Sequence, residues 1–414
     1  MHESFRVLSI NQPLLVFVEI VLFTIALGLL VPISVLFVEC SAALFPSRRS
    51  QWHAMTLRPK VDVLVPAHNE ATGIGATLKT LLPQLTPQDR LVVIADNCID
   101  ETAAVARAIG ATVIERQEPD RRGKGYALDY GLRFIAQNPP EVVVVVDADC
   151  VVHPGTIDRI SRLATAVARP VQATYILTQS ANTGLKDAVS ALAFMVKNLV
   201  RPRGLDRLGL PCLLTGTGMA LPWSVISEVS LASGNIVEDM HLSLELAMAG
   251  HAPVFCSDAK VTGLLPQQKQ AVKSQRTRWE HGHLQTLLTQ VPRLLIASWS
   301  QQRFDLLAIA LDLCVPPLSL LVMIWAVAMG GTLVAGAKMG FPLWTTVLLA
   351  IEGLLILSSI LGAWAKFGRA TLPVLTLLAV PFYLLWKIPL YFAFLVQPQT
   401  KWIRTERDVV DASD

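Results

Sequence analysis

Charged residues are scarce in this chain, and its cysteines form no closely spaced pair. Lys, Arg, Asp and Glu together make up 16% of the 414 residues, which is low for a water-soluble enzyme of this length. The net charge is only +3, so the charge balance gives no case for nucleic-acid binding. The six cysteines show no CxxC pattern, which argues against a zinc knuckle or a disulfide framework and suits a reducing compartment.

Hydrophobic residues, 52% of the chain, are concentrated at its two ends. Residues 14–38 are almost continuously apolar, and about 20 such residues are enough to cross a bilayer. The run is too long for a signal peptide and lacks a small-residue cleavage site. Further apolar runs cover residues 304–330, 342–364 and 371–397. Prolines interrupt the last run, which could be one kinked span or a re-entrant pair.

These runs divide the chain into four parts. We expect a membrane anchor, a middle domain with interfacial helices at its end, a second membrane region and a polar tail, over residues 1–40, 41–303, 304–397 and 398–414. Four basic residues follow the first run: Arg48, Arg49, Arg58 and Lys60. Basic residues beside a span favour the cytoplasmic side. The middle domain is therefore predicted to face the cytosol, at a bacterial inner or plasma membrane.

Charged residues also occur inside the apolar runs, at Glu19, Asp312, Glu352 and Lys387. Such charges within a membrane often mark a functional pathway. Each of them could instead lie near the end of a span, with its charged group extended to the interface.

The middle domain alternates strand-like and helix-like segments. Strands are expected at Val61–Pro66, Leu91–Asp96, Thr112–Glu115 and Val142–Asp147. The helix Glu101–Ile109 lies between two of them, with Asp100 as its expected N-cap. Continuously apolar strands belong to a sheet covered on both faces, and a βαβ succession gives a mainly parallel sheet. The predicted fold class is α/β, and such sheets bind ligands beyond the carboxyl ends of their strands.

Acidic residues stand at the carboxyl ends of two of these strands. Asp96 ends the second strand, and Asp147 and Asp149 end the valine-rich one as Asp-Ala-Asp. Two carboxylates one residue apart could hold Mg²⁺ or Mn²⁺, which take oxygen ligands and leave positions open for phosphate. The alternative is a polar turn that ends a buried strand.

Two helix starts carry further candidates. Lys124 lies in a basic, glycine-containing segment before a helix, where backbone N–H groups could bind phosphate. The alternative is a solvated basic turn. Glu238 and Asp239 open a helix expected over His241–Ala249, where acids usually compensate the helix dipole. A group-transfer enzyme also needs a base for the attacking hydroxyl, and one of these two carboxylates could supply it.

The segment Gln275-Arg276-Thr277-Arg278-Trp279 stands just before the membrane runs return. An arginine here could offset the charge of a departing diphosphate, and the indole could stack on a sugar face. The segment could equally be a basic, aromatic anchor at the membrane interface.

The order of these motifs is more specific than any one of them. Pro66-Ala67-His68-Asn69-Glu70, Asp96, Asp147-Ala148-Asp149, Glu238-Asp239 and Gln275-x-x-Arg278-Trp279 follow one another in a single chain. Over roughly residues 58–285 the chain resembles the processive-type family 2 glycosyltransferases, which include cellulose, chitin and hyaluronan synthases and the similar ceramide glucosyltransferases. This resemblance implies a GT-A-type nucleotide-sugar-binding domain with a mainly parallel sheet, plus N- and C-terminal transmembrane helices.

The resemblance also implies roles for individual residues. The residues expected to bind the donor are Pro66, Glu70, Asp96, Lys124, Asp147, Gln275 and Arg278. The residues expected to contact the acceptor are Gly216, Thr217, Gly218, Glu238 and Trp279. Asp239 would be the catalytic base, and Asp149 with Asp147 would hold Mg²⁺ or Mn²⁺. Two departures stand out: Asn97 replaces a second aspartate, and Arg201-Pro202-Arg203-Gly204 matches nothing in the family pattern.

The implied function is a membrane-bound inverting glycosyltransferase. It would move a sugar from a nucleotide-sugar, expected to be a UDP-sugar, to a saccharide or lipid-linked acceptor in exopolysaccharide synthesis. Membrane lipids and other polysaccharide-synthesis proteins are its expected partners. The alternatives are a non-processive transferase that adds one sugar to a membrane lipid, and a catalytically silent scaffold of a polysaccharide export complex.

Overall fold

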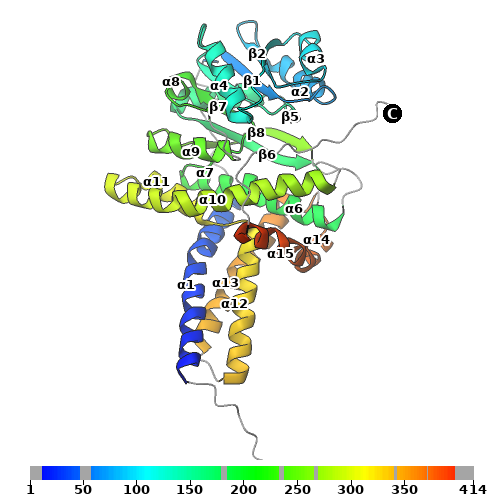
Figure 1. Cartoon of the computed structure of the whole chain (residues 1–414). Coiled ribbons are helices and arrows are strands. Elements are labelled where there is room, and N and C mark those ends of the chain that lie inside the picture. The colour runs from blue at the N-terminus through cyan, green and yellow to red at the C-terminus, as the bar shows by residue number, and fades with distance from the viewer. Residues whose placement is uncertain are drawn as a thin grey trace, which may run out of the picture.

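The computed structural model describes residues 12–46, 57–178, 184–232, 237–264, 269–339, 343–370 and 372–396. An α/β domain stands at one end of the molecule, and long helices extend away from it as a bundle (Figure 1). A layer of helices that includes α10 and α11 lies between these two parts.

An eight-stranded sheet forms the centre of the α/β domain, in the order β3-β2-β1-β4-β7-β6-β8-β5. The strands are β1 Val61–Ala67, β2 Arg90–Asp96, β3 Thr112–Arg116, β4 Val142–Val145, β5 Cys150–Val152, β6 Val171–Thr178, β7 Met219–Pro222 and β8 Val254–Leu264. Strands β3, β2, β1 and β4 are parallel, as are β6 and β8. Strand β7 is antiparallel to β4 and β6, and β5 is antiparallel to β8.

Helices cover both faces of the sheet (Figure 1). They are α2 Ile74–Leu81, η2 Leu82–Gln84, α3 Thr102–Ala108, α4 Lys124–Ile135, α5 Thr156–Val167, α6 Leu185–Met195, η3 Val196–Val200, α7 Arg201–Leu208, α8 Trp223–Ile226 and α9 Glu238–Met248. Two apolar cores result, one containing Val63, Ile74 and Ile160 and the other containing Leu64 and Leu128. Every residue of β4 is buried, so the prediction of an α/β sheet covered on both sides is confirmed.

The four predicted strands are present, with small shifts at their ends. Strand β4 ends at Val145, two residues before Asp147, so the Asp-Ala-Asp segment stands beyond the strand. Helix α3 begins one residue later than expected, and Glu101 rather than Asp100 holds the N-cap position. Asp100 still serves the helix start, because its Oδ1 accepts a hydrogen bond from the backbone N–H of Thr102.

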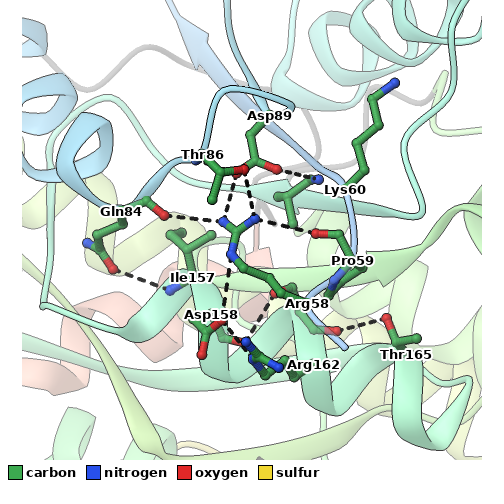
Figure 2. A network of polar contacts seen from close by, with 12 residues as sticks. Arg58, Pro59, Lys60, Gln84, Thr86, Asp89, Ile157, Asp158, Arg162 and Thr165 are labelled. Atoms are coloured by element: carbon green, nitrogen blue, oxygen red, sulfur yellow. Dashed lines mark hydrogen bonds and ion pairs between the residues drawn. The ribbon is translucent and has the colours of Figure 1, made fainter. Parts of the chain in front are cut away.

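A polar network around Arg58 ties the entrance of β1 to the rest of the domain (Figure 2). The Arg58 guanidinium forms ion pairs with Asp89 at 2.7 Å and Asp158 at 3.6 Å, and donates to the carbonyl of Gln84. Lys60 is likewise used within the domain, since its Nζ donates to Asn138 Oδ1. Two of the four basic residues used to predict the membrane orientation therefore belong to the α/β domain, and Arg48 and Arg49 lie outside the described residues.

The remaining helices come from the two ends of the chain. They are α1 Gln12–Ala43, α10 Lys269–Gln301, α11 Phe304–Cys314, α12 Leu318–Met339, α13 Leu343–Ala363, η4 Trp364–Gly368, α14 Leu375–Leu378 and α15 Val380–Val396. In the described part of the chain, three segments are long and apolar enough to cross a membrane: Val16–Ala43, Leu318–Ala337 and Leu343–Gly368. They run side by side and share an apolar core (Figure 1). Many of their outward side chains are apolar and exposed, as expected for contact with lipid.

Two of the predicted apolar runs are not single membrane-spanning helices. The run 304–330 is divided at Pro316 and Pro317, because proline lacks the N–H that a continuing helix needs. Helix α11 lies crosswise next to α10, whereas α12 runs down the bundle (Figure 1). In the run 371–397, α15 has only 17 residues and also lies crosswise, at the domain end of α12.

One buried arginine joins the α/β domain to these helices. Arg201 begins α7, and its Nε donates to Glu39 Oε2 on α1 at 2.6 Å. Its Nη2 donates to the side chain and the carbonyl of Asp312 on α11, at 2.5 and 2.6 Å. Gly204 completes the junction, since a Cβ at this position would lie 1.9 Å from the carbonyl oxygen of Glu39. The segment 201–204 without a family counterpart is therefore where the two parts of the molecule meet.

Two of the charges predicted inside apolar runs have partners. Asp312 pairs with Arg201, and the fully buried Lys387 on α15 pairs with Glu280 on α10. These two charges fasten helices to one another. Glu352 on α13 is also buried, and neither of its carboxylate oxygens has a hydrogen-bond partner among the described residues.

Candidate active site

A cavity of about 720 Å³ opens beyond the carboxyl ends of β1, β2 and β4. Its walls at this end include the predicted site residues Pro66, Glu70, Asp96, Lys124, Asp147, Asp149, Gly216, Glu238, Asp239, Gln275, Arg278 and Trp279. Its other end is bounded by residues of α1, of α12 and of the α11–α12 connection, such as Leu36, Pro317 and Leu318. The widely separated sequence motifs thus converge on a single cavity, which continues to the membrane helices.

Asp96 stands at the end of β2 in a network that the sequence did not reveal. Arg116, its in-register partner on β3, donates from Nη1 to Asp96 Oδ1 at 2.5 Å. His68 Nδ1 lies 2.6 Å from the backbone oxygen of Asp96. Asn97 adopts a left-handed conformation with φ of 52°, and its side-chain amide also donates to Asp96 Oδ1. The one available signal for Arg116 was its place at the end of the neighbouring strand.

Lys124 connects three of the predicted segments. It is the first residue of α4, and its ammonium donates to the Asp147 carboxylate and, at 2.7 Å, to the carbonyl of Gly216. Its Nζ is 4.0 Å from Glu238 Oε1. Burial alone would lower the pKa of Lys124, but the nearby carboxylates of Asp147 and Glu238 outweigh it and hold the pKa above its usual value. Lys124 is therefore a fixed cation of the cavity, and the alternative of a solvated turn does not describe it.

Asp147, Asp149 and Cys150 could together surround a cation, since their ligand atoms all lie within 4.8 Å of one another. Burial, followed by the charges of the two aspartates, raises the pKa of the Cys150 thiol well above its usual value. A neutral thiol is a poor ligand for Mg²⁺ or Mn²⁺, whereas carboxylate oxygens suit both ions. The donor set therefore fits a hard divalent cation held by the two aspartates, with Lys124 already bound to Asp147.

The predicted acceptor loop divides between the cavity and the protein interior. Gly216 lines the cavity with φ of 88°, and a Cβ there would lie 3.3 Å from Asp239 Oδ2 and 3.4 Å from Lys124 Nζ. Thr217 is buried, and its hydroxyl accepts a hydrogen bond from the backbone N–H of Asp147. Gly218 donates its N–H to the carbonyl of Val145. Thr217 and Gly218 thus hold the loop against β4 and are not among the residues that line the cavity.

Glu238 and Asp239 open α9 and face the same cavity. Neither holds the N-cap position, which belongs to Val237. Asp239 Oδ1 accepts a hydrogen bond from the backbone N–H of Met240 at 2.8 Å, which orients its carboxylate. Burial raises the pKa of Glu238 to about 7, against the opposing charge of Lys124, and the negative charge of Asp239 adds to the rise.

Helix α10 contributes the last group of predicted residues. The Trp279 ring packs against Phe194 with ring centroids 5.5 Å apart. Arg278 lines the cavity, and its Nε is buried with no hydrogen-bond partner among the described residues. Arg276 is engaged elsewhere, since it pairs with Asp187 at 2.9 Å and lies over the Trp386 ring. Arg278 is therefore the arginine of this segment that remains available to a ligand.

The α/β fold is GT-A-like, as the family and the mannosyltransferase structure given next show. The chain belongs to the glycosyltransferase-like family 2, whose model matches residues 59–282.

Similarity to individual curated proteins covers a smaller part of the chain. Over 116 residues it is 36% identical to the 4,4'-diaponeurosporenoate glycosyltransferase of Staphylococcus aureus (strain bovine RF122 / ET3-1). Over the same length it is 35% identical to the protein of that name from strain N315. Each match spans 27% of this chain and 30% of the relative's length.

Similarity to solved structures is found at lower sequence identity. A mannosyltransferase from Pyrobaculum calidifontis, in complex with GDP-Man and Mn²⁺, has a TM-score of 0.53 at 20% identity, and the match covers 89% of this chain and 99% of that one. Glucosyl-3-phosphoglycerate synthase from Mycobacterium tuberculosis, in complex with Mn²⁺, uridine-diphosphate and phosphoglyceric acid, also has 20% identity, with a TM-score of 0.35 over 56% of this chain and 80% of that one.

Proposed function

We propose that this protein is a membrane-bound inverting glycosyltransferase that transfers a sugar from a nucleotide-sugar to an acceptor carried on a lipid. The observation that carries the proposal is the continuity of one cavity from Asp147 and Asp149 to apolar residues near the membrane helices. The apolar part of its wall includes Leu36, Val315, Pro316, Pro317, Leu318 and Tyr383. Such a wall favours hydrocarbon over a sugar polymer, because burial of apolar surface stabilises the bound state.

The donor would occupy the end of the cavity nearest the sheet. Asp96, oriented by Arg116, would bind the nucleotide base, with Pro66 and Glu70 beside it. Lys124, Arg278 and Gln275 would contact the diphosphate, because cations and amide donors offset its negative charge. Asp149, with Asp147, would hold Mg²⁺ or Mn²⁺, which when bound supplies positive charge at the leaving nucleoside diphosphate.

Asp239 would act as the base. It takes the proton from the acceptor hydroxyl as that oxygen attacks the anomeric carbon, and the bond from this carbon to the diphosphate oxygen breaks. A single displacement inverts the anomeric centre, so an α-linked donor yields a β-linked product. Glu238 and Trp279 would contact the acceptor, with the indole supported by Phe194. Gly216 leaves room for the acceptor beside Asp239, while Thr217 and Gly218 would act through the shape of the loop.

The membrane helices support this assignment and the proposed orientation. Lys366, the middle residue of η4, donates to the carbonyl of Ala43 at 3.3 Å, so a basic residue stands where the C-terminal end of α1 meets η4. By the positive-inside tendency, we place the α/β domain in the cytosol of a bacterial plasma membrane. The Staphylococcus aureus relatives are named as 4,4'-diaponeurosporenoate glycosyltransferases, which agrees with an acceptor that is not a polysaccharide.

A second candidate is the processive synthesis of a polysaccharide. The ordered motifs fit both reactions, so the product distinguishes them. Purified protein in nanodiscs made from a bacterial lipid extract would receive a panel of radiolabelled UDP- and GDP-sugars with Mg²⁺ or Mn²⁺. A single sugar on material that extracts into organic solvent is the expected product. A water-soluble polymer would favour the second candidate, and no transfer from any donor would contradict both.

A further inference from the structure

A π-helical turn, η3, joins α6 to α7 and forms part of the cavity wall. Its residues Lys197 and Asn198 both line the cavity. π-Helical turns are rare and often occur at functional sites, because the wider turn redirects side chains that a regular helix would place elsewhere. The proposed sugar transfer uses neither of these two residues.

Lys197 carries a charge that the protein does not pair directly. Among the described residues, its ammonium has no hydrogen bond and no carboxylate within ion-pair distance. Of the acidic groups near it, Asp312 binds Arg201 and Glu280 binds Lys387. Burial lowers the pKa of Lys197, and the charges of Asp239, Asp312 and Glu280 do not restore it. An incoming anion would supply the missing charge.

Asn198 gives a second, independent indication of a ligand. Its side chain is 4% exposed, and its Oδ1 is buried without a hydrogen-bond partner among the described residues. A buried acceptor without a partner destabilises the empty site, and a ligand hydroxyl that donates to it would remove that cost. Its two amide atoms can serve a ligand as donor and acceptor.

The neighbouring His283 does not add to the positive charge of this region. Its Nε2 lies 3.2 Å from the carbonyl of Leu313, so this nitrogen carries the hydrogen. Burial, followed by the charge of Lys197, lowers the pKa of His283 to about 3. The imidazole is therefore neutral, and Lys197 is the cation that a ligand would meet.

The packing of η3 places Lys197 at the membrane side of the cavity wall. Val196 and Val200 of η3 belong to the apolar core that α1, α12 and α13 share, and Leu36 of that core also lines the cavity. Lys124, in contrast, lies beside the carboxylates of Asp147 and Glu238. The two lysines are therefore held by different parts of the molecule.

We propose that Lys197 and Asn198 form a subsite for an oxyanion of the acceptor, a carboxylate or a phosphate located between the reacting hydroxyl and the hydrocarbon chain. The inference rests on the proposed function, and it narrows the acceptor to an acidic lipid. Lys197 would donate a charge-assisted hydrogen bond to one oxygen of the anion, and Nδ2 of Asn198 would donate to another. Oδ1 of Asn198 would accept a hydrogen bond from a hydroxyl of the acceptor.

Three photoactivatable probes with the same sixteen-carbon chain test the proposal: a fatty acid, an alkyl phosphate and the neutral alcohol. Each would be titrated onto the full chain in phosphatidylcholine nanodiscs, with cross-linking measured by mass spectrometry. The acidic probes should reach half-saturation at about tenfold lower concentration than the alcohol. Lys197→Gln should remove this preference, and Lys197→Arg should retain most of it. The acidic probe that binds more tightly identifies the oxyanion as a carboxylate or a phosphate.

Lys186→Gln is the matched control, because Lys186 lies on the adjoining helix α6 and over the Trp386 ring. Equal binding of the acids and the alcohol would overturn the proposal, as would an unchanged preference in Lys197→Gln or an equal loss in Lys186→Gln. Nucleotide-sugar binding, measured in the same nanodiscs, separates the hypothesis of the acceptor subsite from that of the transferase function. Donor binding without a charge preference refutes only this subsite, whereas a charge preference without donor binding refutes the proposed transferase.

Discussion

Nε of Arg201 lies 2.6 Å from Oε2 of Glu39, across the boundary between the α/β domain and the first candidate membrane span. The same guanidinium binds Asp312 on α11. One side chain therefore joins three segments that are far apart in the sequence. Since Arg201, Asp312 and Leu36 all line the cavity, this junction also fixes the position of the apolar end of the site relative to its catalytic end.

Replacing Arg201 with Met should destabilise the protein strongly. The substitution leaves Glu39 and Asp312 buried without their cation, and loss of one partner from a buried ion pair costs about 3–5 kcal/mol. Chemical unfolding in detergent micelles, followed by circular dichroism, would measure the loss. Arg207→Met on the same helix should change little. A triple change, Glu39→Leu with Arg201→Met and Asp312→Leu, should recover stability, and failure to do so would show that packing around Gly204 dominates.

Gly216→Ala should reduce activity more than stability. The residue has φ of 88°, and the added Cβ would press on Asp239 and Lys124. Gly250→Ala is the control, because Gly250 has φ of 98° but open space around its missing Cβ. Both changes should cost about 1–2 kcal/mol of stability from backbone strain. Only Gly216→Ala should lower kcat/KM, by about 10- to 100-fold, since small displacements of catalytic groups have effects of that size. Equal activity of the two variants would contradict the placement of Gly216 beside the base.

Asp239→Asn should abolish transfer while leaving donor binding nearly intact. The amide keeps the shape of the side chain but cannot accept the proton of the acceptor hydroxyl, and loss of a general base lowers rates by about 10²- to 10⁴-fold. Product formation and equilibrium binding of the nucleotide would be measured on one preparation. Glu245→Gln, on the same helix and paired with His241, should behave as the unmodified protein. Parallel loss of binding and transfer would assign Asp239 to the donor site instead.

Stability should fall as the pH rises towards 7, owing to Glu238. Its pKa is about 7 in the folded protein, above the ordinary 4.5. The stability that its protonated form contributes is fully present below about pH 4.5 and is lost as the pH rises through 7, because unfolding then releases a proton. The loss is on the order of 3 kcal/mol. Glu238→Gln should lack this part of the pH dependence, and the difference between the two unfolding curves isolates it from other groups. Identical profiles would show that the pKa of Glu238 does not change on folding.

Removal of divalent cations should stop transfer, and added Mn²⁺ or Mg²⁺ should restore it. The two carboxylates that would hold the ion lie one residue apart beyond β4. Asp149→Asn should raise the Mn²⁺ concentration for half-maximal activity by at least about tenfold, because an amide is a weaker ligand than a carboxylate. The exposed Asp258 offers the control, as Asp258→Asn. Full activity of the chain in a chelator would exclude the assigned role.

The sequence predicted the parallel half of the sheet because that half is built from local patterns. Four apolar strands with helices between them were visible, and the rule that ligands bind beyond the carboxyl ends of strands located Asp96, Asp147 and Asp149. The other four strands, β5, β6, β7 and β8, were not predicted, since they pair with partners distant in the chain. The membrane helices were found from hydropathy alone.

The residues that the sequence did not identify act through long-range contacts. Arg116 meets Asp96 only through strand register, and Arg201 meets Glu39 across 162 positions. Lys197 and Asn198 lie in a π-helical turn of the cavity wall, and the sequence patterns gave no signal for that turn. Charged residues in apolar runs were predicted to mark a pathway or a span end. For Asp312 and Lys387, the partners are arginine and glutamate side chains from other segments.

The packing of α1 against α12 and α13 has a consequence for biosynthesis. Helix α1 can meet α12 and α13 only after residues 44–317 have been made, and its Glu39 has neither Arg201 nor Asp312 as a partner until those residues follow. During that interval α1 lacks the two helices that pack against it. Translation that stops before α12 would leave α1 and the α/β domain without the α12 residues that line one end of the cavity.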